Sequence, residues 1–263
     1  MKSPIKYIGG KAKLIKNKSL VFPDIFNDYY EPFCGGMSPF LSLISCKNSF
    51  ISDNSENLIN FYKVLKYRPT ELILELKTNP FFKNCKTNYI LNRKRFNDIN
   101  VKEHPIEKAA LFLYLNKTGF NGMYRENKKG HFNIPFGNMK NPNWCDTENL
   151  LAVSKKLNDA VLSCQDYKNI SPNKGDLVYL DPPYYNTFSD YTKNTFGEAE
   201  HIELYNKCVE WNSRGIYFIS SNSDSKFILD LYKDFNITKI PIKYSISSGT
   251  RKNTFELLIK NFS

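Results

Sequence analysis

The sequence has 263 residues, of which 41% are apolar and 24% are charged, an ordinary composition for a globular protein. It contains no run of about eighteen apolar residues, and lysines crowd its first residues, so we expect neither a membrane span nor a signal peptide, but a cytoplasmic protein. The net charge of +11 favours a polyanionic partner, and the six cysteines and three histidines lack zinc-site spacing, so we expect reduced thiols and no metal cofactor.

The first elements predict the start of a doubly wound parallel sheet. A short apolar strand runs into a Cys-Gly-Gly turn and a helix follows around Phe40. A second strand then ends in an acidic residue before a second helix. This β-α-β-α order is typical of an α/β fold. The strands are expected at 29–33 and 50–53, the turn at 34–36 and the second helix at 55–65.

The middle third of the sequence predicts a basic, mostly helical insert. Residues 59–148 contain 16 Lys and Arg against 8 Asp and Glu, whereas the rest of the chain contains 21 against 18. A solvated helical surface would also be basic, but this concentration of charge favours a nucleic-acid face. Helices are expected at 70–76, 89–96 and 106–115, and a β-hairpin at 119–137, where Asn-Gly and Lys-Gly pairs are turn signals.

The α/β alternation resumes after the insert. Apolar strands return, and the last two segments suit an antiparallel pair at the sheet edge. We therefore expect a single catalytic α/β domain built from residues 1–58 and 149–263, interrupted by the insert at 59–148. Strands are expected at 161–164, 177–181, 216–220, 237–244 and 255–259, with a helix at 201–212.

The most informative segment is Asp181-Pro182-Pro183-Tyr184, which directly follows an apolar strand at the carboxyl edge of the sheet. An aromatic amino group is a poor nucleophile because its lone pair is delocalised. Two acceptors, the Asp181 carboxylate and a carbonyl near Pro182, would localise that lone pair. The prolines stiffen the turn, and Tyr184 offers a flat face for an extruded base. The alternative is a plain strand-to-loop turn with a core tyrosine.

Two segments ahead of this motif suit a nucleotide. Glycines after the first strand let backbone amides approach a ligand, although a glycine pair is often only a tight turn. Asp53, about 20 residues later, stands where a doubly wound fold places the carboxylate that binds ribose hydroxyls. Its alternative role is to cap the following helix. The segment from Lys6 to Lys11 contains a Gly-Gly pair that could close over a ligand or belong to a disordered basic terminus.

In this order the segments resemble a Dam-type DNA adenine-N6 methyltransferase of the α-group, or D12 class. The resemblance implies a Rossmann-like S-adenosylmethionine-dependent methyltransferase sheet with an inserted, mostly helical DNA-recognition domain carrying a β-hairpin. It also implies a monomer that binds double-stranded DNA. The FCGGMS run suggests the phage-like branch, with Met37 where a spaced glycine is commoner. The matching segments are 6–11, 31–41, 52–53, 113–137, 175–184, 214–222 and 245–258.

The resemblance also implies roles for individual residues. Asp181, Pro182 and Tyr184 would be catalytic, in a direct in-line methyl transfer to a flipped adenine. Asp166 would meet the adenine amino group of the cofactor, or be only a surface turn residue, and Tyr167 would pack near that ring. Further contacts to S-adenosylmethionine are implied for Tyr7, Lys11, Phe33, Gly35, Asp53 and Asp181.

For DNA, the GFNGMYR run at 119–125 resembles the base-reading hairpin of the family, which suggests GATC as the recognition sequence. An ordinary hairpin with a solvent-facing arginine is the alternative. The loop at 247–252 resembles a family loop near the phosphates but is shorter than in some relatives. This resemblance implies that Arg251 contacts DNA. Base edges in the major groove would be read by Asn121, Met123 and Arg125, with help from Lys6.

Other activities compete with this interpretation. A cytosine-C5 enzyme would need a nucleophilic cysteine after a proline, and no cysteine here follows proline. Cytosine-N4 enzymes more often begin the motif with serine, so Asp181 favours adenine. An RNA adenine methyltransferase would more often carry Asn in place of Asp181. A catalytically silent DNA-binding module that kept the fold is the rival from outside the enzymes.

Overall fold

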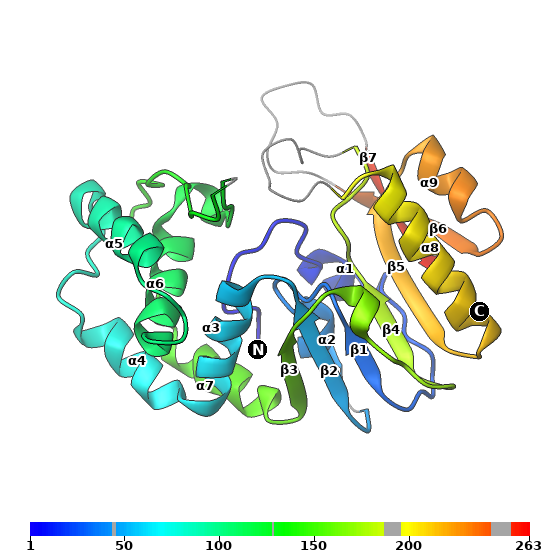
Figure 1. The fold of residues 1–263 in the computed structure, drawn as a ribbon, viewed down its shortest axis with the longest axis horizontal. Helices are drawn as coiled ribbons and strands as arrows, with labels where there is room; N and C mark the ends of the chain where they lie inside the picture. Colours follow the sequence, from blue (N-terminus) through cyan, green and yellow to red (C-terminus); the bar gives the residue numbers. More distant parts are fainter. Residues whose placement is uncertain (44–45, 128, 187–195, 243–253) are drawn as a thin grey trace.

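The computed structural model describes residues 1–43, 46–127, 129–186, 196–242 and 254–263, which contain a seven-stranded sheet in the order β3-β2-β1-β4-β5-β7-β6 (Figure 1). Neighbouring strands from β3 to β5 are parallel, whereas β7 is antiparallel to both β5 and β6. The predicted α/β class and the antiparallel pair at one edge are confirmed. The strands are β1 (Tyr29–Glu31), β2 (Ser49–Asp53), β3 (Ala160–Cys164), β4 (Leu177–Leu180), β5 (Tyr217–Ser223), β6 (Asn236–Ile242) and β7 (Thr254–Lys260).

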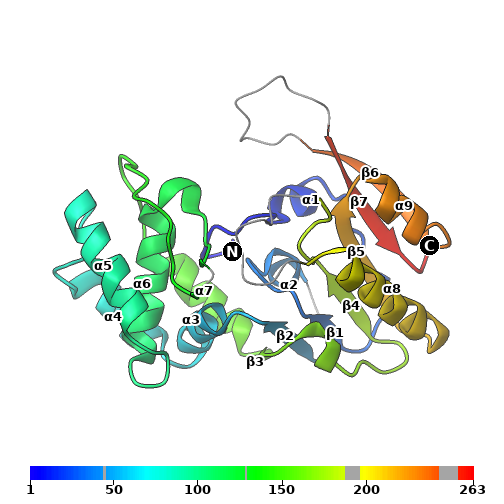
Figure 2. The same cartoon turned by 45° about the horizontal axis from the view of Figure 1, so that its top comes forward.

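Each face of the sheet carries its own apolar core, because successive side chains of a strand point to opposite faces. Tyr29 and Tyr179 belong to one core. Their sequence neighbours Tyr30 and Val178 belong to the other, together with Trp211 of helix α8 (Glu198–Ser213), which lies along β4 and β5 in Figure 2. Burial on both faces explains why these strands are apolar without alternation.

Most helices begin where the sequence offers a start signal. Pro69 and Pro105 occupy first-turn positions, where the missing backbone N–H costs no hydrogen bond. The six predicted helices, which correspond to α2, α3, α4, α5, α6 and α8, are confirmed, whereas α1, α7 and α9 were not predicted. The helices not yet given bounds are α1 (Ala12–Lys16), α2 (Ser38–Ser42), α3 (Glu56–Tyr67), α4 (Pro69–Thr78), α5 (Lys86–Asp98), α6 (Pro105–Thr118), α7 (Thr147–Leu157) and α9 (Lys226–Leu231).

Helices α4, α5 and α6 stand beside the β3 side of the sheet, and α3 links the two regions (Figure 1). Helix α3 packs on β2 and β3 as well as on α4 and α6. The expected domain boundaries after residues 58 and 148 therefore fall inside α3 and α7. One apolar cluster runs continuously from the sheet into α6, whose middle is buried on all sides. Within the described ranges, no helix is long and apolar enough to cross a membrane.

The segment expected as a β-hairpin at 119–137 does fold back on itself in an antiparallel sense, but irregularly. Its described residues form two isolated bridges in place of a continuous ladder, and the Asn-Gly pair lies in a 3-10 turn (Phe120–Gly122). Aromatic packing explains the departure, because the Tyr124 ring lies 4.8 Å from Phe112 and 5.5 Å from Phe132 and draws the chain onto α6. The bridges join Gly119 to Phe136 and Glu126 to Phe132.

Candidate active site

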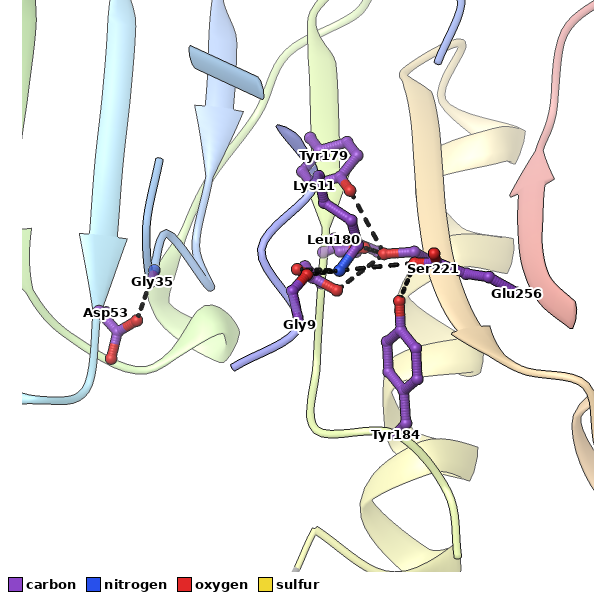
Figure 3. Close-up of polar contacts among 10 residues, drawn as sticks. Gly9, Lys11, Gly35, Asp53, Tyr179, Leu180, Tyr184, Ser221 and Glu256 are labelled. Carbon is purple, nitrogen blue, oxygen red and sulfur yellow. Dashed lines mark hydrogen bonds and ion pairs between the residues drawn. The ribbon is translucent and has the colours of Figure 1, made fainter. Parts of the chain in front are cut away.

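The predicted site residues follow strands whose carboxyl ends meet at one edge of the sheet. Asp53 ends β2, Asp181 follows β4, and Ser221 lies in the second half of β5. Because these strands run parallel, their ends share the edge where α/β folds bind ligands. Figure 3 shows two groups of polar contacts there, one at Asp53 and Gly35 and one around Lys11, Ser221 and Glu256.

Both oxygens of the Asp181 carboxylate are held by side chains. The Nζ of Lys11 donates to Oδ2 at 2.6 Å, and the Oγ of Ser221 donates to Oδ1 at 2.8 Å. Lys11 is only 3% exposed, although it comes from the segment ahead of the first strand. The structure thus places Lys11, a predicted cofactor contact, directly on the predicted catalytic carboxylate. Each carboxylate oxygen has a second lone pair with which to accept another donor.

Tyr184 is anchored beside this pair by Glu256 of β7. Its hydroxyl donates to Glu256 Oε1, and the Lys11 ammonium lies 3.5 Å from the same oxygen and 5.1 Å from the Tyr184 ring centre. Burial, followed by the charges of Asp181 and Glu256, raises the pKa of Tyr184 well above its usual value. The phenol therefore stays neutral and remains a donor. Pro182 is buried in the turn between Asp181 and this tyrosine.

Ser221 and Glu256 were not among the predicted site residues. Ser221 lies one residue beyond the strand expected at 216–220, and no local pattern distinguishes it from a solvent-facing serine. Glu256 carried a usable signal, since it is the one acid in the expected strand 255–259, whose other residues are apolar, and it is only 6% exposed. A buried carboxylate in such a strand requires a charged or hydrogen-bonding partner.

Asp53 binds backbone amides on both of its sides. Its Oδ2 accepts from Gly35 N at 3.2 Å and its Oδ1 accepts from Ser55 N at 3.0 Å. The alternative role of Asp53 as the cap of α3 is wrong, because the capping side chain is Ser55, which accepts from Leu58 N. Burial raises the pKa of Asp53, and the amide of Gly35 is the largest influence that opposes this rise.

Aromatic rings surround this carboxylate end. A Cβ at Gly35 would lie 2.8 Å from Cδ1 of Tyr7, so the Tyr7 ring rests directly on the glycine backbone. Phe33, half-buried, stacks on Tyr167 with ring centres 5.2 Å apart. The Tyr167 hydroxyl is buried without a hydrogen-bond partner among the described residues. A fixed carboxylate, a turn with two glycines and an aromatic pair fit the nucleoside of S-adenosylmethionine.

Asp166 and Met37 complete this half of the site. Asp166 is exposed and caps the short turn Tyr167–Asn169 by accepting from Lys168 N at 2.9 Å. Met37, at the position where a spaced glycine is commoner, has φ +52°, in the left-handed region that glycine favours. The backbone shape is therefore the one a glycine would adopt, and the methionine side chain is fully buried beneath it.

The predicted DNA contacts gather at a second place, between the amino-terminal segment and the 119–137 segment. Lys6 is exposed and lies against Gly122, and Asn121 is exposed with φ +54°. Met123 is half-buried and packs on the main core, while Arg125 Nε donates to Asn133 Oδ1 at 3.0 Å. Arg251 and the whole 247–252 loop lie outside the described residues.

Behind the Asp181 turn, a buried histidine supports the chain that follows Tyr184. His201 of α8 is fully buried, with Nδ1 3.5 Å from the amide nitrogen of Asn222. The Oδ1 of Asn222 accepts from Tyr185 N at 3.1 Å. The ring of Tyr185 meets His201 edge to face, with centres 5.8 Å apart. The pair thus links α8 to the residue directly after Tyr184.

Burial of His201 leads us to expect that the free energy of unfolding decreases as the pH falls. Burial lowers its pKa to about 4 from an ordinary value of 6.5, so the unfolded chain binds this proton first as the pH falls. Holding His201 neutral therefore contributes at most about 3 kcal/mol to the dependence of the free energy of unfolding on pH. This contribution is fully present above pH 6.5 and is lost progressively as the pH falls toward about 4. Urea unfolding of the wild type and His201→Gln at pH 7.5, 6 and 5 measures it, and the wild type should lose more.

The difference between these two proteins isolates the histidine. Burial also raises the pKa of Glu31 to about 8, and that group acts in the opposite direction, since the folded state binds its proton first. Both proteins contain Glu31, so its contribution cancels. Identical losses of stability in the two proteins between pH 7.5 and 5 would mean that His201 is not held neutral.

Comparison with known proteins agrees with this geometry. Residues 7–246 match the family of D12 class N6 adenine-specific DNA methyltransferases. A type II methyltransferase of Lactococcus lactis, M1.LlaDCHI, is 34% identical over 98% of this chain and 94% of its own length. The type II methyltransferase M.MjaIII of Methanocaldococcus jannaschii is 34% identical over 98% of both chains. The DNA adenine methylase of Escherichia coli K12 is 31% identical over 97% of this chain and 93% of its own. The chain therefore belongs to the D12 class and is an adenine-specific DNA methyltransferase.

Proposed function

We propose that the protein methylates N6 of adenine at GATC in duplex DNA by direct transfer to a flipped base. The observation that supports this most is the Asp181 carboxylate at the carboxyl edge of β4, fixed by Lys11 and Ser221. A carboxylate held in place before the base arrives costs no reorganisation when it accepts a hydrogen from the amino group. The similarity to curated DNA adenine methylases supports the same reaction.

In this proposal the side chains orient the adenine and make its amino group a better nucleophile, and none of them forms a covalent bond with the base. Asp181 accepts a hydrogen bond from one N6–H and so localises the nitrogen lone pair. Tyr184, tied through its hydroxyl to Glu256, offers a ring of fixed orientation on which the base stacks. Lys11 balances the charge of two carboxylates, half-buried Asp181 and buried Glu256. S-adenosylmethionine, when bound, supplies the methyl group on a positively charged sulfur.

The cofactor would lie along the neighbouring group of residues. Asp53 would accept from the ribose hydroxyls, since each of its oxygens has a lone pair beyond the one used by a backbone amide. Gly35 leaves room for the Tyr7 ring and holds Asp53 through its backbone amide, and Phe33 offers an aromatic surface. Asp166 and Tyr167 would contact the adenine, and Tyr7 would cover the loop from the amino-terminal side.

DNA recognition is assigned to the insert at 59–148 and the amino-terminal segment. The excess of positive charge in this range supports a phosphate-binding surface. The GATC assignment and the phage-like branch rest on the resemblance of the GFNGMYR and FCGGMS runs. Base reading is proposed for Lys6, Asn121, Met123 and Arg125, and a backbone contact for Arg251.

Arg125 gives a prediction on specificity. A guanidinium matches the O6 and N7 acceptors of guanine, so Arg125→Ala should relax discrimination at one base pair by roughly 1–3 kcal/mol. Methylation rates on a GATC duplex and its single-base variants, at fixed salt, measure the effect. Lys129→Ala is the control, because an exposed lysine that only meets phosphate should weaken binding to all duplexes alike. Equal losses on every duplex for Arg125→Ala would make it a backbone contact.

The function as a whole is tested by sequencing DNA from cells that express the protein, with a readout of modified adenines. We expect N6-methyladenine at GATC, and none in cells that express the Asp181→Ala variant. Methylation at another sequence would overturn the GATC assignment while leaving the reaction intact. Modified cytosine in place of adenine would overturn the assigned reaction.

A further inference from the structure

We propose that Asn116 is a positioning residue that couples base reading to the catalytic carboxylate. The inference rests on the proposed function in taking Lys6 and the 121–125 run as base-reading. The inference adds that Asn116 holds Lys6 and the 121–125 run together, and that the amino-terminal segment connects them to Asp181. No local signal in the sequence marks Asn116, which lies within a helix of mainly apolar residues.

The Asn116 side chain joins two backbone segments that are far apart in sequence. It is fully buried, and its Oδ1 accepts from Lys6 N at 2.8 Å. Its Nδ2 donates to Lys6 O at 2.7 Å and to Gly122 O at 3.0 Å. Both amide hydrogens and the carbonyl are therefore used. Removing this side chain would leave three backbone groups without their partner, two of them partly buried and one buried, which is costly.

Gly122 shows how closely the two segments meet. Its φ is +65°, and a Cβ there would lie 2.2 Å from Cδ of Lys6. Any side chain at this position would thus displace the Lys6 side chain or the turn itself. The amino-terminal segment and the base-reading loop are in direct contact, with Asn116 as the clamp on their inner side.

The same segment reaches the catalytic centre within a few residues. Tyr7, next to Lys6, rests on Gly35 in the cofactor half of the site. A turn follows, in which Gly10 N donates to Tyr7 O at 3.2 Å, and it brings Lys11 onto Asp181 at 2.6 Å. A wrong base pair that displaces Gly122 therefore displaces Lys6, and with it the segment that carries the partner of Asp181.

The test compares discrimination rather than activity alone. The preferred site of the wild type is first mapped by sequencing, whether or not it is GATC. Rates are then measured at saturating methyl donor on that duplex and on its single-base variants. Asn116→Ala should lower kcat on the preferred duplex and reduce the discrimination ratio by about tenfold. Asn92→Ala is the matched control, since Asn92 is a buried helical amide that donates to Phe81 O at 2.8 Å. It should cost stability and leave the ratio unchanged.

Two further variants separate coupling from simple structural support. Gly122→Ala disturbs the same contact from the loop side and should reproduce the loss of discrimination, which also covers the case in which Asn116→Ala folds poorly. In a Lys6→Ala background, Asn116→Ala should cause little additional loss of discrimination, because the base-reading side chain that the clamp positions has already been removed. Discrimination that matches Asn92→Ala, or losses that add fully to those of Lys6→Ala, would overturn the coupling. A preferred site other than GATC would instead count only against the GATC assignment.

Discussion

Replacing Asp181 with alanine is expected to reduce the rate of methyl transfer at least about a hundredfold, by analogy with removal of one preorganised hydrogen-bonding group from an active site. The variant loses the acceptor that prepares the amino group. It should stay folded, because Lys11 retains Glu256, 3.5 Å away, as a partner for its buried charge. Single-turnover rates with labelled methyl donor and duplex DNA measure the loss, and a DNA-binding assay shows whether the duplex is still bound.

Ser221→Ala is the matched control for this result. It keeps the carboxylate and its Lys11 partner but removes the hydrogen bond to Oδ1. Because the acceptor itself and its charged partner remain, the expected rate loss is smaller than for Asp181→Ala. A folded Asp181→Ala protein with a near wild-type rate would contradict the catalytic role proposed for the turn at 181–184.

Replacing Asp53 with alanine should weaken S-adenosylmethionine binding by about 1–3 kcal/mol, the order of a lost charge-assisted hydrogen bond. Calorimetry without DNA isolates this step from base flipping. The structure adds a second contribution, because Gly35 N and Ser55 N lose their acceptor in the variant. Asp53→Asn keeps an acceptor oxygen and removes the charge, so it should fall between the wild type and the alanine variant.

Asp28→Ala provides the control for Asp53. Asp28 precedes β1 at the opposite edge of the sheet, where its Oδ1 accepts from Asn48 Nδ2 at 2.8 Å. Its removal should leave affinity for the methyl donor unchanged. Unchanged affinity in a folded Asp53→Ala protein would mean that Asp53 serves only to hold the Gly35 loop.

Sequence patterns located the strand ends well, because a parallel sheet obeys strong rules. The apolar runs that end at Asp53 and at Asp181 predict strands whose carboxyl ends lie at the edge of the sheet where ligands bind. The same patterns left the role of Asp53 open between a ribose ligand and a helix cap. Only the structure showed that Ser55 does the capping.

The partners of Asp181 could not be predicted from the sequence, because they arise from long-range packing. Nothing local to Lys11 indicates that it reaches a carboxylate of β4, and Ser221 resembles any serine in a strand. The irregular form of the hairpin at 119–137 could not be predicted for a related reason. Its Asn-Gly pair is a strong local turn signal, but packing of Tyr124 on Phe112 of α6 decided the path of the chain.

The contact between Lys11 and Glu256 has a consequence for how the protein acquires its activity. The reactive centre joins Lys11, the residue directly before α1, to β7, so it has one of the longest sequence separations that the fold offers. During synthesis, the sheet from β1 to β5 and the helices of the insert can pack before β7 emerges. Until then, Lys11 and Tyr184 lack a partner that they have in the finished protein. A nascent or truncated chain can thus be largely folded while its reactive centre is still incomplete.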